Sequence, residues 1–469
     1  MKRVISLTLS LLMILSFIAA VSCSSQNEET FDIGLENDFQ VDLSGQHYVW
    51  GSAWQEQLLP SAYFSLAGDM AHKRLDDLTE TYGCTFEVIA WEDGGSRILT
   101  EAAAGYTSID FLDSHASNGG IQLYRSNMLY SLDEIPNLDF SDDRFGTTRF
   151  LQYGIFDGKF YGFYQYAWEF PPEYHGVIHF NVDMLRSLGI NTPHELHENG
   201  MWDWANFKEF LLTIQSSAAS ANYESDFIPF ICGSNYAADA IGFMFANGLK
   251  MVEGSGGNYT FGFDNPAGIA AVEFLADLFS EGLYSSRGHG EFVINKKSAI
   301  MSQESYFSTH YNEKESSNEY LPAQDYAYGM IRFPHGPNGD ENSVSGYVHH
   351  GRRLNWILRY TDKEVEDIGL VMNFVFAPLD GSDGWSGLLK NQIFYSAEDL
   401  DEYSYMLENV NFNYDGMFLE KGYDSWTGNI TSAITGRKSP SEAFESSRTA
   451  IQEAIDKNVT WTFDELVNQ

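Results

Sequence analysis

The stretch Thr85-Phe86-Glu87-Val88-Ile89-Ala90-Trp91 is rich in the β-branched and aromatic residues typical of a strand. Helical patterns flank it at Tyr63–Tyr82 and at Arg97–Ala104. Two further short strands are expected at Tyr48–Trp50 and at Ile109–Leu112. Strands that alternate with helices at this spacing are typical of βαβ units around a mostly parallel sheet. We therefore predict an α/β fold.

Three helix starts later in the chain carry capping signals. Asn265 precedes Pro266, and both Asp203 and Asn181 stand before apolar residues at helical spacing. Short polar side chains accept hydrogen bonds from the free N–H groups of a first turn, and proline suits that turn. We predict a packing helix after each of these caps and a largely helical region over 360–469.

The start of the chain has the pattern of an export signal. Lys2 and Arg3 precede an apolar run over Val4–Val21, and the small residue Ser22 follows. A positive segment, a short apolar segment and a small residue are typical of a cleaved secretory signal. We predict a signal peptide over 1–22.

The signal ends in Ala20-Val21-Ser22-Cys23, which resembles a bacterial lipobox. In such a motif the cysteine is lipidated and becomes the new N-terminus. We therefore predict that Cys23 carries acyl chains, that residues 23–44 form a flexible tether, and that the body is extracytoplasmic and anchored to the cell membrane. An ordinary signal peptide cut nearby and an uncleaved anchor helix remain as alternatives.

The composition excludes one class of partner. The 469 residues include 66 acidic against 27 basic side chains, a formal net charge of −39. A surface of this sign repels nucleic acid, so we exclude nucleic-acid binding. The length exceeds what one hydrophobic core usually organises, which favours two domains.

Cysteine and histidine spacing indicates no metal site. Beyond Cys23 only Cys84 and Cys232 remain, too few for a disulfide framework or a cysteine-based metal site. The pair His349-His350 lacks helix-spaced metal partners. We predict neither a metal nor a cofactor.

Five segments resemble, in the same order, motifs of the extracellular solute-binding proteins of ABC importers, specifically the large carbohydrate-associated family called family 1. They are Asp157–Phe163 ("GKxYGxP"), His179–Pro193 ("YNxxLLxxxGIxxP"), Trp202–Phe207 ("WTWDEF"), Phe292–Met301 ("FxxGKAAM") and Tyr328–Pro337 ("GxxPxPxGP"). The chain departs from the pattern at Gln165, where the family has a Pro-Gln pair, and at Lys297, where it prefers glycine. The resemblance extends over nearly all of the chain after the signal.

The resemblance implies a two-lobed periplasmic-binding-protein-like fold of type II, with hinge crossings and an interlobe cleft that holds the ligand. Carried over by segment, lobe one takes 45–175 plus 303–345, and lobe two takes 176–302 plus 346–469. The crossings are then expected near Tyr174–Asn181, Ala299–Tyr306 and Ser345–Trp356. Cys84 and Cys232 fall in different lobes, so we predict two separate buried thiols rather than a bridge.

Ligands of open α/β sheets bind beyond the carboxyl ends of the strands, and this rule selects candidate side chains from the loops. Aromatic faces suit the C–H faces of a sugar, and carboxylates, amides and hydroxyls suit its hydroxyl rim. The expected ligand-binding residues are Trp54, Gln55, Trp91, Glu92, Asp113, Ser114, Trp168, Glu169, Tyr236, Glu304, Tyr306 and Trp356.

Several of these residues have a second interpretation. Trp54 and Trp168 stand in polar, loop-like settings, which favours ligand stacking over a core position. Asp113 serves equally well as a cap of the next helix. Trp91 stands at a strand end and could belong to the core.

These observations predict a binding protein, not an enzyme, that captures a mono- or oligosaccharide and delivers it to an ABC permease as a monomer. A surface glycosidase or another polysaccharide-processing lipoprotein is the alternative from another class, since it would need only two suitably spaced carboxyl groups. The same fold with a peptide, polyamine or metal complex as ligand is the third possibility.

Overall fold

The structure is a computed structural model that describes residues 41–59, 65–139, 143–146, 149–164, 171–293, 295–305, 307, 327–349, 351, 353–377 and 394–467. The compact unit begins at Asp42. Leu43 is 2% exposed, and its N–H donates to the Tyr82 carbonyl over 2.8 Å. The tether predicted to run to Ser44 therefore ends earlier, because Leu43 is part of a hydrophobic core.

The first sheet confirms the three strands predicted near the start of the body. Its order is β2 (Thr85–Ala90), β1 (His47–Ser52), β3 (Phe111–His115), β14 (Arg353–Ile357) and β6 (Gly162–Phe163). Strands β1, β2 and β3 are mutually parallel, whereas β14 runs antiparallel to β3. The carboxyl ends of β1, β2 and β3 therefore meet at one edge, together with the start of β14.

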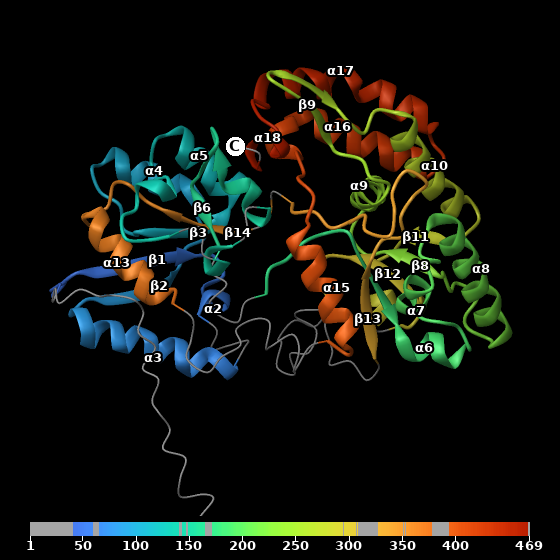
Figure 1. The fold of residues 1–469 in the computed structure, drawn as a ribbon, viewed down its shortest axis with the longest axis horizontal. Helices are drawn as coiled ribbons and strands as arrows, with labels where there is room; N and C mark the ends of the chain where they lie inside the picture. Colours follow the sequence, from blue (N-terminus) through green and yellow to red (C-terminus); the bar gives the residue numbers. More distant parts are fainter. Residues whose placement is uncertain are drawn as a thin grey trace, which may run out of the picture. The chain divides into compact units, whose positions relative to one another are not determined.

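Helices cover both faces of this sheet (Figure 1). Helices α3 (Ser65–Tyr82) and α13 (Val365–Val375) pack on the face that contains Trp50 and Phe111. Helices α4 (Gly94–Ala103) and α5 (Ile121–Arg125) pack on the opposite face with Leu112 and Trp356. Smaller elements here are α2 (Gln55–Leu58), η1 (Ala116–Gly120), η2 (Leu132–Glu134), η3 (Asp143–Phe145), η4 (Phe150–Gly154), β4 (Ile155–Phe156) and β5 (Lys159–Phe160).

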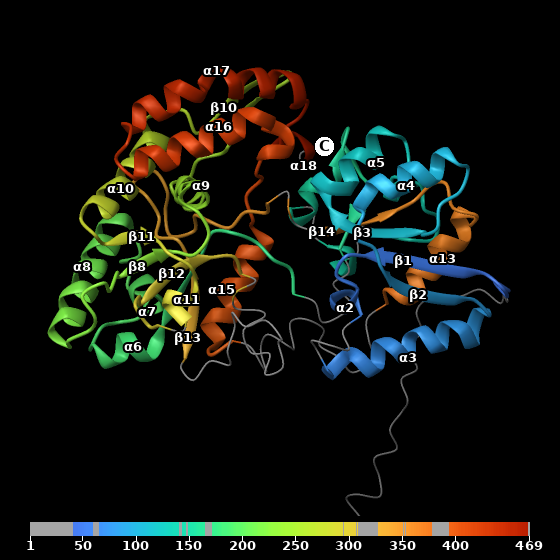
Figure 2. The same cartoon turned by 180° about the vertical axis from the view of Figure 1, so that it is seen from behind.

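The second sheet has the order β11 (Tyr284–Ser286), β8 (Phe230–Cys232), β12 (Ile300–Gln303), β7 (Val177–Asn181) and β13 (Tyr328–Arg332). Strands β8, β11 and β12 are parallel, and β7 is antiparallel to both of its neighbours. Strands β8, β11, β12 and β13, with α8 (Trp204–Ser220) and α10 (Pro266–Ser280) beside them, can be followed in Figure 2.

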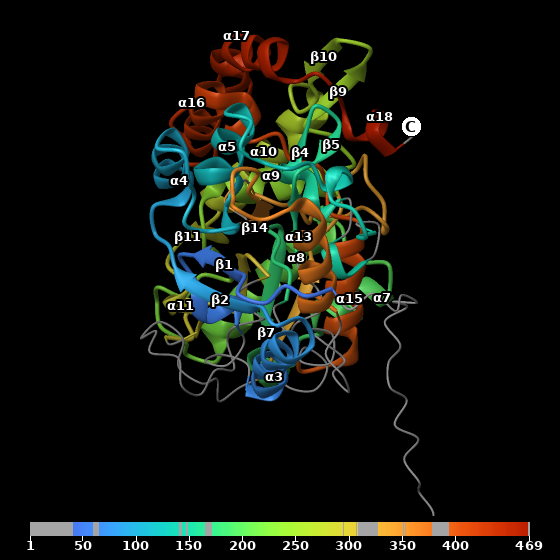
Figure 3. The same cartoon turned by 90° about the vertical axis from the view of Figure 1, so that its left-hand side faces the viewer.

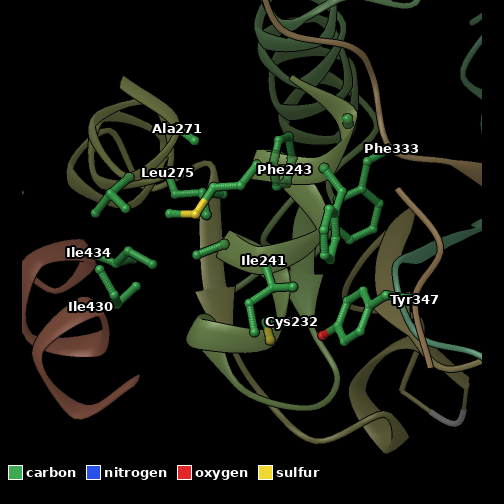
Figure 4. Packing of buried hydrophobic residues seen from close by; sticks show 14 of the residues in the cluster. Cys232, Ile241, Phe243, Ala271, Leu275, Phe333, Tyr347, Ile430 and Ile434 are labelled. Atoms are coloured by element: carbon green, nitrogen blue, oxygen red, sulfur yellow. The ribbon is translucent and has the colours of Figure 1, made fainter. Parts of the chain in front are cut away.

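One large core binds this sheet to its helices and includes Phe207, Ile241, Leu275 and Ile430. Figure 4 shows Ile430 and Ile434 facing Leu275 and the α9 side chains Ile241 and Phe243. The elements of this lobe are α6 (Val182–Ser187), α7 (Pro193–Glu198), α8 (Trp204–Ser220), α9 (Tyr236–Ala246), β9 (Val252–Ser255), β10 (Asn258–Phe261), α10 (Pro266–Ser280), α11 (Gly290–Val293), α15 (Ala397–Glu408), α16 (Gly416–Ile434), α17 (Pro440–Asn458) and α18 (Phe463–Val467).

The C-terminal region is largely helical, as predicted. Helices α16 and α17 lie side by side, and α17 also packs on β10 of the small β9–β10 hairpin (Figure 3). The three predicted caps are confirmed: the side chains of Asn181, Asp203 and Asn265 accept hydrogen bonds from first-turn N–H groups of α6, α8 and α10.

The assignment of two late segments to the lobes is wrong. Strand β13, expected in lobe one within 303–345, pairs with β7 of the second sheet. Strand β14, expected in lobe two within 346–469, pairs with β3 of the first sheet. Both strands are almost fully buried, so the local pattern does not distinguish their partners; only pairing with strands far away in sequence does.

The crossings change accordingly. The chain passes between the sheets after β6 and again between β13 and β14, near the expected Tyr174–Asn181 and Ser345–Trp356. The crossing expected at Ala299–Tyr306 is wrong, because β12 and β13 belong to the same sheet. A third passage leads from α13, in the core of the first sheet, to α15, which packs on β13.

Three segments lie side by side at the crossings and form what we call the hinge ribbon, centred on His175, Tyr347 and Asn411. The N–H of His175 donates to Tyr347 O over 2.8 Å, and the N–H of Tyr347 donates back over 3.1 Å. The N–H of Asn411 donates to Gly346 O over 2.8 Å. The Tyr347 hydroxyl points to α9, where it donates to the Ala238 carbonyl (Figure 4).

Cys84 and Cys232 are both buried and free, and they belong to the cores of different sheets, as predicted. Cys23 lies outside the described residues. No helix in the part of the chain that the structure describes has the length and apolar character needed to cross a membrane.

Candidate functional site

The carboxyl edge of the first sheet gathers a hydroxyl, a carboxylate and an indole. The last residue of β1, Ser52, pairs in register with Asp113 of β3, and its hydroxyl donates to Asp113 Oδ2 over 2.5 Å. The same hydroxyl oxygen accepts the N–H of Trp54 over 2.8 Å. The register of two parallel strands thus places Trp54 beside Asp113, although 59 positions of numbering separate them.

Arg353 completes this group, although it was not among the expected ligand-binding residues. As the first residue of β14 it stands opposite His115 of β3. Its Nη1 lies 3.6 Å from Asp113 Oδ2, and its guanidinium lies 4.8 Å from the centre of the Trp54 ring. The Trp54 ring also stacks on His115, with 4.9 Å between ring centres. Arg353 was missed because the carboxyl-end rule considers where strands end, whereas β14 starts at this edge.

The charge of Asp113 is compensated in place. The carboxyl is 3% exposed, and burial raises its pKa, while the neighbouring Arg353 and the Ser52 hydroxyl act in the opposite direction. Asp113 does not cap the following helix, since it lies within β3. We call Ser52, Trp54, Asp113, His115 and Arg353 the first edge.

The carboxyl edge of the second sheet holds two of the predicted residues. Tyr236 opens α9, directly after β8, and its phenol oxygen accepts the N–H of Ser286 at the end of β11 over 2.7 Å. Glu304 follows β12. We call Tyr236, Ser286 and Glu304 the second edge.

Glu304 faces the hinge ribbon. Its Oε1 lies 3.3 Å from His175 Nε2, and its carbonyl accepts a hydrogen bond from His179 Nε2 over 3.1 Å. Burial raises the pKa of the Glu304 carboxyl to about 7, with His349 opposing the shift. Burial lowers the pKa of His179 to about 3, so this imidazole is neutral at ordinary pH.

A buried carboxyl beneath the second edge fastens α9 to the strands. Asp239 Oδ2 accepts hydrogen bonds from the Tyr284 hydroxyl over 2.5 Å and from the Ser302 hydroxyl over 2.6 Å. These donors belong to β11 and β12. Burial raises the pKa of Asp239 to about 6, while its hydroxyl partners act against the shift. Asp239 therefore holds the first turn of α9, which carries Tyr236, against the sheet.

The structure places two predicted tryptophans in the core rather than on a ligand surface. Trp91 is 3% exposed; its indole N–H donates to Gly94 O over 2.9 Å, and Arg97 covers its ring. Trp356 is fully buried and donates its indole N–H to Ser114 O over 3.3 Å. Both rings fill space on one face of the first sheet, so their burial contradicts a direct ligand contact in this conformation.

The other predicted residues have more varied positions. Ser114 is buried beside Trp356, Gln55 is half-buried at the start of α2, and Glu92 is exposed after β2. Trp168, Glu169 and Tyr306 lie outside the described residues. Across the described ranges, no three His, Cys, Asp or Glu side chains are grouped so that they could hold a metal ion.

Sequence comparison finds no matching protein-family model and no matching curated protein. Structural comparison does find similar folds. The GacH receptor of Streptomyces glaucescens, solved unliganded and with acarbose, aligns with a TM-score of 0.59 at 13% identity, covering 90% of this chain and 100% of its own.

Two other solved structures are similar over comparable lengths. The cyclic α-maltosyl-1,6-maltose binding protein of Arthrobacter globiformis has a TM-score of 0.60 at 13% identity, with 88% of this chain and 99% of its own covered. UgpB of Mycobacterium tuberculosis, in complex with glycerophosphocholine, has a TM-score of 0.58 at 15% identity, with 89% and 100% covered. The chain has the two-lobed fold of these solute-binding proteins.

Proposed function

We propose that this protein is the extracellular solute receptor of an ABC importer, and that it captures a carbohydrate between the first edge and the second edge. The observation that carries the proposal is the grouping of Trp54, Asp113 and Arg353 at the carboxyl ends of the first sheet's strands, where open α/β sheets bind ligands. The fold supports the same assignment, because the similar proteins described above include binders of acarbose and of a cyclic maltosyl-maltose.

The chemistry of the first edge suits a polyol. The half-buried Trp54 ring offers an aromatic face for sugar C–H groups. The buried Asp113 carboxylate lies beside Arg353 and positions it, and the Arg353 guanidinium donates hydrogen bonds to hydroxyls. A micromolar dissociation constant corresponds to about −8 kcal/mol, which one stacked ring and several such hydrogen bonds supply after the ordering cost.

We expect the two lobes to close on the solute by rotation at the hinge ribbon. A solute that contacts both edges stabilises the closed arrangement, because it makes its full set of contacts only there. The permease then recognises the closed form. We further propose that Cys23 is lipidated after removal of 1–22, which holds the monomeric receptor at the outer face of the membrane.

A thermal-shift screen of the full-length chain in detergent tests this function. The panel contains maltose, acarbose, cyclic maltosyl-maltose, ribitol and glycerophosphocholine, with spermidine, a tripeptide and amino acids for comparison. A solute that binds only the native state raises the melting temperature as its concentration rises. We expect a rise with at least one of the sugars.

Two outcomes contradict the proposal. A rise confined to spermidine, the tripeptide or amino acids would reassign the ligand class. Release of p-nitrophenol from chromogenic glycosides in the same preparation would make the protein a glycosidase.

A further inference from the structure

Titratable side chains from four parts of the chain gather where the hinge ribbon meets the second edge. Glu304 Oε1 lies 3.3 Å from His175 Nε2, and the His175 and His349 rings are 5.3 Å apart. On its other side, His349 Nε2 lies 3.6 Å from Asp415 Oδ2. We call His175, Glu304, His349 and Asp415 the hinge cluster.

The hinge cluster is joined to the ribbon through the backbone. The N–H of Ser305 donates to Tyr174 O over 2.8 Å, and the N–H of Tyr174 donates to the Ser305 hydroxyl over 3.0 Å. His175 is itself the ribbon residue that exchanges two hydrogen bonds with Tyr347. A rotation within the ribbon therefore changes the surroundings of Glu304 directly.

Water still reaches part of the cluster. The side chain of Glu304 is 24% exposed and that of His349 is 32% exposed, whereas His175 is 10% exposed and Asp415 is fully buried. If the edges close on a solute, Glu304 at the second edge loses its remaining contact with water. Burial penalises the charged form of a carboxyl group.

We propose that closure of the two lobes is proton-linked through Glu304: the closed, solute-bound form takes up a proton at the hinge cluster, so solute capture is tighter in mildly acidic than in alkaline surroundings. This inference concerns the regulation of the proposed binding site and rests on the proposed function.

The groups that face Glu304 set the sign of the effect. The pKa of Glu304 is raised to about 7, so the carboxyl changes charge near neutral pH. His179 and Tyr347 stay neutral in that range, because burial lowers the pKa of the first and raises the pKa of the second. Above pH 7 the Glu304 carboxyl is mostly ionised, so closure has to remove a charge from water. Near pH 6 the carboxyl is mostly neutral, and closure carries no such cost.

The magnitude follows from linkage. If closure holds Glu304 protonated throughout, the affinity for a panel sugar that passes the thermal-shift screen falls by up to about tenfold between pH 6 and pH 8. The variant Glu304→Gln, which cannot take up the proton, is expected to lose the pH dependence, so that its affinities at pH 6 and pH 8 are equal whatever their absolute value.

A ligand-free measurement of lobe closure tests the inference independently of the solute. Cysteines for a fluorophore pair are introduced as Tyr106→Cys, 55% exposed in lobe one, and Leu212→Cys, 36% exposed in lobe two. The full-length chain also carries Cys23→Ser, and the buried Cys84 and Cys232 do not react. Energy transfer is recorded from pH 6 to pH 9.

A matched control is available on the surface. Glu87 lies 3.2 Å from His47, nearly the same carboxylate–imidazole distance as in the hinge cluster, but both side chains are at least half exposed. In the labelled protein, the variant Glu87→Gln should leave the dependence of energy transfer on pH unchanged. Melting curves of all variants establish that they are folded.

Transfer efficiency that falls with a midpoint near pH 7, and no longer does so in Glu304→Gln, supports the inference. A flat profile, or the same profile in Glu304→Gln, overturns it. If lobe closure depends on pH but no sugar binds, only the carbohydrate assignment is refuted. Sugar binding of equal strength at pH 6 and pH 8 refutes only the proton linkage.

Discussion

The first edge and the second edge each present a carboxyl group at the end of a strand, but the two groups differ in their partners. Asp113 is 3% exposed and lies beside the guanidinium of Arg353 and the Ser52 hydroxyl. Glu304 keeps 24% of its side chain exposed and faces the imidazole of His175.

The two acids show how burial and a neighbouring cation act on a carboxyl group. Burial raises the pKa of both groups, and at Asp113 the Arg353 guanidinium, which is charged at every physiological pH, acts against this shift. At Glu304 burial raises the pKa to about 7, so this carboxyl changes charge near neutral pH. The first edge therefore holds its acid beside a permanent cation, whereas the acid of the second edge changes charge in the physiological range.

The largest expected effect is that of Asp113→Ala. Removal of the carboxylate breaks the contact between Asp113 and the nearly buried Arg353, and breaking a buried pair costs about 3–5 kcal/mol. Urea denaturation should reveal this loss. Ser52→Ala, which removes one hydrogen bond and no charge, should cost only about 1 kcal/mol. If both variants lost the same amount, the ion pair would contribute nothing.

Asp239 tests whether a buried acid whose described partners are hydroxyl groups behaves like Glu304. Its pKa of about 6 exceeds the ordinary value of 3.8, so between these pH values the folded state binds the proton more tightly than the unfolded state. The contribution of Asp239 to stability is thus fully present below pH 4 and is lost as the pH rises through 6, by about 3 kcal/mol.

Urea denaturation gives the free energy of unfolding of the unmodified protein and of Asp239→Asn at pH 4 and at pH 7. The change in the difference between the two proteins measures the contribution of Asp239. The unmodified protein should lose stability relative to the variant on going to pH 7. A difference that stays constant would mean that Asp239 is ionised in the fold throughout.

Trp54→Ala should separate binding from stability at the first edge. A lost stacking face weakens sugar binding by about 1–2 kcal/mol, roughly 5- to 30-fold, while the half-buried ring contributes less to folding than a core tryptophan. Titration calorimetry and melting curves measure the two quantities. Tyr106→Ala, an exposed aromatic on the loop before β3, is the control and should leave binding unchanged. Equal losses of binding in both variants would remove Trp54 from the site.

The smallest effect is expected from Tyr236→Phe at the second edge. The change removes the acceptor of the Ser286 N–H, which costs about 1 kcal/mol or less because water can replace the phenol at this exposed position. If the hydroxyl also binds solute, the affinity falls severalfold at an unchanged melting temperature. An affinity identical to that of the unmodified protein would confine solute contact to the first edge.

Local signals in the sequence were sufficient for much of the fold. Alternating strand and helix patterns predicted β1, β2, β3, α3 and α4. When one face of an element is buried, its apolar residues recur at a regular spacing that is visible within a short stretch of sequence. The caps Asn181, Asp203 and Asn265 were predictable for the same reason, since each acts on N–H groups only two or three residues away.

Half of the residues of the candidate site could also be predicted from the sequence. The rule about carboxyl ends selected Trp54 and Asp113, which the register of β1 and β3 brings together, and Glu304 and Tyr236 at the second edge. Trp91 and Trp356, which were also expected at the site, are buried, because a position in or near a strand does not say which way a large ring points.

The α/β class, the separate buried thiols Cys84 and Cys232, and the loops that follow the strands could be predicted from local sequence patterns. The folded structure was needed to learn that β14 joins the first sheet, that β13 joins the second, and that Arg353 consequently meets Asp113 and Trp54. Helices, caps and strand patterns depend on neighbours along the chain. Strand order and the partners of a buried charge depend instead on residues that are distant in sequence and meet only after the sheets have formed.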